Sequence, residues 1–233
     1  MSFLVPPRRP SHEHLDDPHL PPDEMRRSLE DLRMVNRRWG GSRALERHLL
    51  PRVQALGPGR ARILDVGAGS GEMAFRLEKS LRSAGCDASV LALDLQWRHL
   101  MAGRSMARGE SARAAAADAF RLPIGDNAVD FVVSSLFFHH FSPEENGCLL
   151  QEFSRVARRG FAVLDLRRHR LPEIFVALAG SAVFKARISV EDGIASVRQA
   201  YTPDEALRVA RRVAPGSRAR RVFPFRLLLT AGS

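Results

Sequence analysis

Apolar residues follow two different periods along this chain, and their alternation predicts a sheet flanked by helices. Short, largely apolar runs predict buried strands at 61–66, 89–94, 112–117, 129–135 and 160–166. Helical spacing of the apolar positions between them predicts helices at 72–84, 98–108 and 143–157. Strands that alternate with helices in this way require a parallel sheet with helices on both faces. We therefore expect an α/β fold.

Both ends of the chain depart from this alternation. Residues 1–22 are rich in proline and lack apolar periodicity, which predicts a disordered tail. From Met25, apolar residues recur at helical intervals, so residues 23–57 are expected to form a helical cap. We assign residues 58–233 to one domain. Its last two strands are expected at 218–223 and 225–230, separated only by Pro224.

Residues 167–202 are more than a minimal α/β fold needs between its fifth strand and a helix that begins at Pro203. Within them, 172–184 is predicted to be an apolar helix and 188–193 a loop. Insertions at the carboxyl end of a parallel sheet lie where ligands bind. We interpret 167–202 as a substrate lid; the alternative is an excursion that only packs.

The run 63–72, Ile-Leu-Asp-Val-Gly-Ala-Gly-Ser-Gly-Glu, joins a buried strand to a glycine-rich turn and a helix start. Gly67, Gly69 and Gly71 permit backbone angles that a Cβ disfavours, so the loop can approach a ligand while helix N–H groups point at it. The spacing is G-x-G-x-G. The dinucleotide-binding pattern G-x-G-x-x-G is excluded, because Glu72 stands at its last position. We infer a nucleotide cradle of another kind.

Carboxylates follow the loop at places where nucleotide-binding sheets use them. Asp65 lies at the end of the first strand. Asp94 ends the second, where a carboxylate can accept hydrogen bonds from both hydroxyls of a ribose. The motifs that come next are Ala117-Asp118-Ala119, Leu122-Pro123, Asp126, Val129-Asp130-Phe131 and Leu136-Phe137-Phe138-His139-His140-Phe141.

The order and spacing of these motifs over residues 61–166 resemble the class I S-adenosylmethionine (SAM) dependent methyltransferases, and among them the ubiquinone/menaquinone-biosynthesis-like branch. The resemblance implies a Rossmann-like, mostly parallel seven-stranded sheet with an antiparallel last strand. It also implies SAM as cofactor and S-adenosylhomocysteine (SAH) as product. The cofactor-binding residues that it implies are Asp65, Gly67, Ala68, Gly69, Gly71, Asp94, Leu95, Gln96, Asp118, Ala119 and Ser135.

The resemblance gives each carboxylate an expected role. Asp65 is expected to orient the methionine end of SAM, Asp94 to bind the ribose and Asp118 to accept from the adenine amino group. Ala119 would offer its backbone N–H to the adenine ring. The alternative for each carboxylate is a strand-end or turn residue that is satisfied by local hydrogen bonds.

Three histidines are candidates for a catalytic base. His139 and His140 follow the fourth strand, and an imidazole with an ordinary pKa of about 6.5 can take a proton from a phenol or enol. His169 follows the fifth strand. The alternatives are a structural role for the pair and a surface position among arginines for His169. The tail histidines, near Asp16 and Asp17, form no convincing metal-ligand pattern, so we assign no metal.

Composition changes the expected partners more than the fold. A net charge of +10 would suggest an anionic partner. Lys79 and Lys185 are the only lysines, however, and so strong a preference for arginine is typical of a GC-rich genome; we do not expect a nucleic acid partner. Cys86 and Cys148, the only cysteines, exclude a disulfide scaffold and favour a cytoplasmic location. No transmembrane segment is expected, while peripheral contact of the lid with anionic lipid is left open.

We predict an enzyme that methylates oxygen or carbon of a small aromatic, polyketide-like or quinone-like molecule, in bacterial secondary metabolism, as a monomer or homodimer. The alternatives are an RNA or protein methyltransferase that uses the arginine-rich surface, and a noncatalytic partner that retains the SAM fold. Against the first, residues 135–138 read Ser-Leu-Phe-Phe where amino-directed nucleic-acid methyltransferases carry N-P-P-[YF]. Residues 37–39, Arg-Arg-Trp, either reach the pocket or form a solvated helix end.

Overall fold

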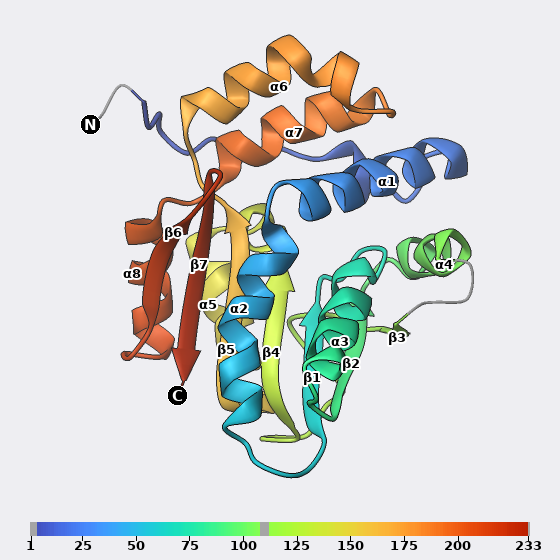
Figure 1. The fold of residues 1–233 in the computed structure, drawn as a ribbon. Coiled ribbons are helices and arrows are strands. Elements are labelled where there is room, and N and C mark those ends of the chain that lie inside the picture. The colour runs from blue at the N-terminus through green and yellow to red at the C-terminus, as the bar shows by residue number, and fades with distance from the viewer. Residues whose placement is uncertain (1–3, 108–111, 233) are drawn as a thin grey trace.

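Seven strands form one sheet at the centre of the protein (Figure 1). The computed structural model describes residues 4–107 and 112–232, so the final residue of the helix expected at 98–108 lies outside the described residues. The strand order is β3-β2-β1-β4-β5-β7-β6. The strands are β1 (Ala61–Val66), β2 (Ala88–Asp94), β3 (Arg113–Ala116), β4 (Val129–Ser135), β5 (Ala157–Leu166), β6 (Arg218–Val222) and β7 (Arg226–Gly232).

The strand directions confirm the predicted sheet. Neighbours from β3 to β5 all pair in parallel, whereas β7 runs antiparallel to both β5 and β6. After β1 the chain adds β2 and β3 on one side and then returns to place β4 on the other side of β1. Open α/β sheets bind ligands in the crevice that such a reversal leaves at the carboxyl ends of the strands.

Helices cover both faces of the sheet (Figure 1). On one face, α2 (Gly41–Gln54), α3 (Glu72–Ser83) and α4 (Trp97–Met106) bury apolar side chains against the strands. On the other face, α5 (Pro143–Val156) and α8 (Pro203–Val213) do the same. Both α5 and α8 begin with a capping box, in which a hydroxyl accepts from the backbone N–H of the third helical residue.

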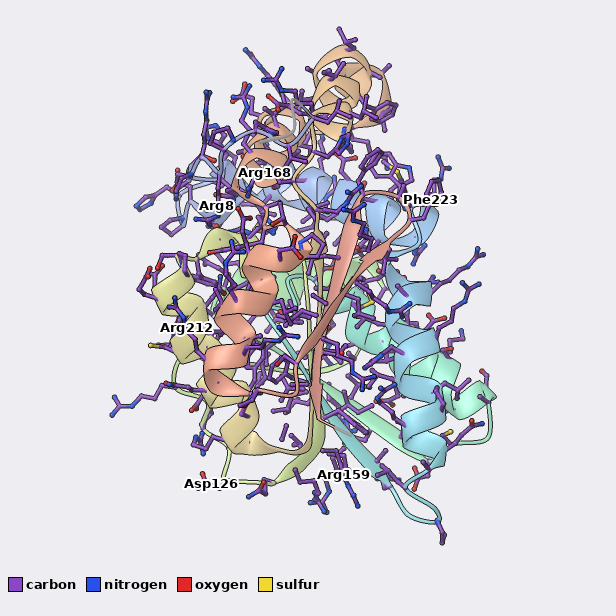
Figure 2. All side chains as sticks on the ribbon, turned by 90° about the vertical axis from the view of Figure 1, so that its left-hand side faces the viewer. Arg8, Asp126, Arg159, Arg168, Arg212 and Phe223 are labelled. Carbon is purple, nitrogen blue, oxygen red and sulfur yellow. The ribbon has the colours of Figure 1, made fainter. Side chains whose placement is uncertain are left out.

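The last two strands meet in the tight turn that the sequence predicts. Only residues 223–225 lie between β6 and β7; the Phe223–Pro224 peptide bond is cis, and Phe225 has a φ of 47°. The Phe223 side chain is exposed at the tip of the turn (Figure 2).

Three further helices lie across the carboxyl ends of the strands (Figure 1). They are α1 (Pro22–Arg38) and the two helices of residues 167–202, which we call the lid: α6 (Arg170–Val183) and α7 (Ile188–Gln199). The expected loop at 188–193 is wrong, because α7 starts there. Asp31 of α1 organises that start, as it accepts hydrogen bonds from the backbone N–H groups of Lys185 and Ala186 and from the Ser189 hydroxyl. In the described ranges, no helix is long and apolar enough to cross a membrane.

The N-terminal segment differs from the expected disordered tail. Residues 4–21, which we call the strap, run along the lid and end at α1 (Figure 1). Arg8 donates hydrogen bonds to the backbone oxygens of Gln199, His139 and Phe141, and Arg168 donates to the oxygen of Pro6. Both arginines lie at the lid end of the molecule (Figure 2). Arginine side chains of the strap and of the lid thus make the hydrogen bonds that a proline-rich segment cannot make within its own backbone.

Candidate active site

One large cavity, of about 810 Å³, lies at the carboxyl ends of β1, β2 and β4. Its floor is the glycine loop that follows β1, together with the ends of the neighbouring strands. Its roof is formed by the strap, α1 and the lid. The cavity therefore occupies the crevice where the strand order predicts a ligand.

The glycine loop needs its glycines for two different reasons. Gly67, Gly69 and Gly71 have φ values of 69°, 54° and 68°, a region that side chains disfavour. A Cβ on Gly67 would lie 2.3 Å from the Phe137 ring, so this glycine also permits close packing. A Cβ on Gly69 would meet nothing within 4 Å, and Gly69 lines the cavity. The backbone at Gly69 is thus open to a ligand.

Asp65 is the most unusual carboxylate of the site. It lies at the end of β1, is 1% exposed, and neither of its oxygens has a hydrogen-bond partner of normal geometry among the described residues. Burial, and then repulsion from Asp94, raise its pKa to about 7. A buried acid in this state is suited to a ligand that supplies a positive charge or hydrogen-bond donors.

Asp94 and Asp118 lie on the adjoining wall of the cavity. Asp94 Oδ2 accepts from the Gly69 N–H at 2.7 Å, and Oδ1 accepts from the Gln96 N–H at 2.8 Å. Burial raises the pKa of Asp94 despite these two hydrogen bonds. Asp118 Oδ1 accepts from the Phe120 N–H at 2.9 Å, and its residue is exposed. Each carboxylate has further lone pairs for a ligand.

The remaining residues that the sequence assigns to the cofactor are brought together here with one exception. Those lining the cavity are Ala68, Leu95, Gln96, Ala119 and Ser135. The Ser135 hydroxyl is buried and, within the described part of the chain, has no hydrogen-bond partner. Gly71 does not line the cavity; it is the N-cap of α3, where its left-handed backbone turns the loop into the helix.

His139 is enclosed between two carboxylates. Its side chain is 2% exposed, with Nδ1 2.7 Å from Asp165 Oδ1 and Nε2 3.2 Å from Glu13 Oε1. Burial alone would lower its pKa, but the charge and hydrogen bond of Asp165, joined by those of Glu13, raise the pKa to about 10. Burial alone would raise the pKa of Glu13, but the hydrogen bond from His139 and the proximity of His140, joined by the Ser196 hydroxyl, lower it to about 2.

His140 is more open than its neighbour. Its side chain is 20% exposed, Nδ1 lies 3.0 Å from Asp16 Oδ2, and Nε2 lies 3.7 Å from Glu13 Oε2. Both histidines line the cavity. Both histidines therefore lie at the cavity, as the sequence predicts. His139 is buried between two carboxylates, whereas His140 is partly exposed.

His169 does not line this cavity. It is the N-cap of α6, where its Nδ1 accepts a hydrogen bond from the Leu171 N–H at 3.1 Å, and its ring packs against Phe225. Burial, followed by repulsion from Arg167 and Arg221, lowers its pKa. A ring nitrogen that is used to cap a helix is not free to act as a base, so the prediction of a base at this position is wrong.

An apolar chamber adjoins the histidine pair and the glycine loop. Trp39 of the cap packs edge-on against two lid residues, Phe175 and Phe184, with centroid distances of 5.7 and 6.4 Å. Phe137 and Phe141 pack against each other from below, at 4.8 Å. All five rings line the cavity. Such a chamber suits a flat, apolar molecule, which aromatic rings bind by their faces and edges.

Residues 37–39 were expected either to reach the pocket or to form a solvated helix end, and the structure shows some of each. Trp39 lines the cavity, and Arg38 is exposed to solvent. Arg37 Nε donates to Glu72 Oε1 at 2.7 Å, and Glu72 is a buried residue of the cavity wall. This ion pair fastens the end of α1 to the start of α3, beside the glycine loop.

Sequence reasoning missed the strap's contribution to the site. Glu13 is buried, and besides His139 it accepts hydrogen bonds from the Ser196 hydroxyl at 2.7 Å and the Gln199 amide at 2.6 Å. Proline content had marked this segment as disordered. Asp165 was also missed. Its place at the end of β5, a parallel strand, could have identified it by the rule that selected Asp65 and Asp94.

Comparison with known proteins identifies the central segment. Residues 63–160 match the model of a family described as a methyltransferase domain. A segment of 115 residues is 33% identical to the ubiquinone/menaquinone biosynthesis C-methyltransferase UbiE of Dinoroseobacter shibae. That match covers 48% of this chain and 44% of the relative, so the chain spans less than half the length of that relative.

Solved structures extend the similarity in fold to most of the chain. The magnesium protoporphyrin IX methyltransferase of Synechocystis, solved with bound SAH, has a TM-score of 0.57 at 16% identity and covers 90% of this chain and 93% of its own. A SAM-dependent methyltransferase from Aquifex aeolicus has a TM-score of 0.52 at 20% identity, with 78% and 88% coverage. Residues 63–160 therefore match a methyltransferase domain, and most of the chain has the Rossmann-like fold of the class I methyltransferases.

Proposed function

We propose that this protein transfers the methyl group of SAM to oxygen or carbon of a small, largely apolar molecule. The observation that supports this most directly is that one cavity joins the glycine loop and three carboxylates to an aromatic chamber. Methyl transfer requires a nucleophile to approach opposite the departing sulfur. The main contribution of the protein is to align the two reactants in a site from which water is excluded.

The residues at the loop fit SAM, which when bound supplies a methyl group on a positively charged sulfur. Asp65 has two buried oxygens without partners, the Ser135 hydroxyl also lacks one in the described structure, and the backbone at Gly69 is open. We assign Asp65 to the ammonium group, Asp94 to the ribose hydroxyls and Asp118 to the adenine amino group. We assign the remaining contacts to Gly67, Ala68, Gly69, Leu95, Gln96, Ala119 and Ser135, all of which line the cavity.

For acceptors that lose a proton, we propose His140 as the residue that takes it. His140 lines the cavity next to the aromatic chamber and is the more exposed of the pair. His139 is held on both ring nitrogens and serves to position the loop and the strap. Full turnover of the true acceptor by His140→Ala would rule out this role.

The acceptor that we propose is aromatic, polyketide-like or quinone-like, in bacterial secondary metabolism. Support comes from the five aromatic rings of the chamber and from the similarity to a quinone-biosynthesis C-methyltransferase over about half of the chain. We also propose a cytoplasmic location, supported by Cys86 and Cys148, which are both free thiols, and a monomer or homodimer as the acting form.

Calorimetric titration tests the proposed function. SAM and SAH are titrated into the purified protein, with NAD and a short RNA as controls over a range of salt concentrations. Micromolar binding of the two adenosyl compounds alone is the expected result, and it justifies a screen of phenolic and polyketide acceptors. Absence of this binding, together with salt-sensitive RNA binding, would instead make the arginine-rich surface the functional one.

The raised pKa of Asp65 predicts that SAH binding below pH 7 releases a proton. The folded, ligand-free protein keeps this carboxyl protonated up to about pH 7, whereas its ordinary pKa is 3.8. The ligand ammonium favours the ionised form, so we expect affinity to rise by up to about tenfold per unit between pH 5.5 and 6.5. The ligand amino group, with a pKa of about 8, stays charged throughout this range. Calorimetry in two buffers of different ionisation enthalpy counts the protons released.

Asp65→Asn is the matched control for this measurement, because it keeps the shape of the side chain and removes the titration. In the variant, proton release should disappear. The stability of the ligand-free protein gives a second readout. Because the pKa of Asp65 is higher in the folded than in the unfolded protein, the free energy of unfolding of the wild type should fall as pH rises from about 4 to 7. The Asp65→Asn variant should not show this fall. A wild-type affinity that is flat over this range would contradict the assignment.

A further inference from the structure

We propose that Glu13, His139 and His140 form a binding site for a divalent transition-metal ion, of which zinc is the natural probe. The inference rests on the proposed function, because the open side of this site faces the chamber assigned to the methyl acceptor. One ligand atom from each residue lies within 4.8 Å of the others, and all three residues line the cavity.

The distances between the ligand atoms fit a metal centre. His139 Nε2 is 3.2 Å from Glu13 Oε1, and His140 Nε2 is 3.7 Å from Glu13 Oε2. Two ligand atoms bound to zinc at about 2.1 Å, at a tetrahedral angle, are about 3.4 Å apart. The three ligand atoms lie within 4.8 Å of one another, so a cation can be held between them if the side chains close in by up to about 1.4 Å.

The groups behind the ligands orient the imidazoles as metal ligands are oriented. His139 Nδ1 lies 2.7 Å from Asp165, and His140 Nδ1 lies 3.0 Å from Asp16. A carboxylate on Nδ1 fixes that N–H and leaves the lone pair of Nε2 for a cation, the arrangement found in carboxylate–histidine–zinc sites. Both Nε2 atoms face the Glu13 carboxylate. Because metal ligands must be deprotonated, the cation would displace the proton that His139 carries on Nε2 in the metal-free protein.

Glu13 is itself held in place for this role. The Ser196 hydroxyl and the Gln199 amide, both from the lid helix α7, donate to Oε1 at 2.7 and 2.6 Å. Residues on both sides of Glu13 are tied to the body, since Arg8 donates to the backbone oxygen of His139 and Asp192 accepts from the His14 N–H. The strap thus delivers one ligand of the site, and the loop after β4 delivers the other two.

Three protein ligands leave at least one position free on a zinc ion, as in catalytic rather than structural zinc sites. That position faces the cavity, which favours an acceptor that presents a hydroxyl or carbonyl oxygen to the metal. A metal ion lowers the pKa of a bound hydroxyl. When the metal is bound, His140 would act on the acceptor through the cation; in the metal-free protein it takes the proton itself, as proposed above.

The test is zinc binding by the full chain, without a histidine tag and without SAM. We expect calorimetry to show one site per chain, and Co²⁺ to give the strong visible absorption of a site with low coordination number. Glu13→Gln and His140→Gln should each weaken binding about 100-fold. His14→Gln is the matched control, because His14 neighbours Glu13 in the strap but pairs with Glu191 at the surface; its affinity should equal that of the wild type.

Thermal unfolding of each metal-free variant shows whether it is folded, and a zinc-dependent rise in melting temperature should appear only in the wild type and His14→Gln. The proposal would be overturned if the wild type bound zinc no more tightly than His140→Gln, or no more tightly than Glu13→Gln. SAH titration is run in parallel. SAH binding without zinc binding rejects only the metal site, whereas zinc binding without SAH binding rejects the proposed function.

Discussion

Gly103→Ala is expected to lower the free energy of unfolding by at least about 2 kcal/mol, although alanine is the better helix former. Gly103 lies within α4 against the glycine loop, and a Cβ there would be 1.9 Å from the backbone oxygen of Ser70 and 2.6 Å from its carbonyl carbon. Overpacking costs about 1–3 kcal/mol or more, and a clash this short with backbone atoms lies at the upper end, so about 2 kcal/mol remains after the gain of about 1 kcal/mol in helix propensity. Thermal unfolding should show a melting temperature lower by about 4–8 °C.

The same clash should weaken SAH binding, because Ser70 can yield only if the loop between Gly69 and Gly71 moves. Gly147→Ala is the matched control. Gly147 also lies within a helix, α5, but a Cβ there meets nothing within 4 Å. This variant should gain about 0.5–1 kcal/mol in stability and keep its SAH affinity. Equal stabilities for the two variants would show that α4 does not constrain the loop.

Asp94→Ala is expected to weaken SAH binding by about 100-fold or more while the protein stays folded. A hydrogen bond to a charged group contributes about 1.5–3 kcal/mol, and two such bonds to ribose hydroxyls would be lost. Asp94 also holds the Gly69 N–H, so the loop loses an anchor. Stability should change little, because burial disfavours this carboxylate and so offsets part of what its hydrogen bonds contribute. Calorimetry with SAH measures the loss.

Asp87→Ala provides the comparison, since Asp87 precedes the same strand and its side chain makes an exposed ion pair with Arg60. Its SAH affinity should match that of the wild type. Asp94→Asn keeps an acceptor oxygen and should fall between the wild type and Asp94→Ala. An Asp94→Ala affinity within threefold of the wild type would refute the assignment of this carboxylate to the ribose.

The residues that the sequence places correctly at the cavity were found from local patterns. Asp65 and Asp94 were found because each ends an apolar strand, and parallel strands bring their carboxyl ends to one edge. The turn at Pro224 was found in the same way, from residues that are neighbours in the chain. In these cases, the residues that determine the local structure all lie within a few positions of it.

The rest depends on partners that are remote in the chain. Glu13 joins the site through His139, 126 positions away, and no local period marks either residue for the other. The strap is held by hydrogen bonds from Arg8 to backbone oxygens of the body and from Arg168 to the Pro6 oxygen, so its own composition, which lacks apolar periodicity, indicated the wrong state. The prediction of a base at His169 was wrong for a different reason. His169 does follow the end of a strand, but its Nδ1 accepts the hydrogen bond that caps α6.

The strap, α1 and the lid contact one another as well as the cavity. Leu15 and Met25 belong to one buried cluster on which Ile188 packs, and Asp31 holds the start of α7. A chimaera that takes only the lid of a relative would break these contacts. Acceptor preference is therefore best exchanged between relatives by moving residues 4–40 and 167–202 together, while α2 and the cofactor half at 61–166 remain unchanged.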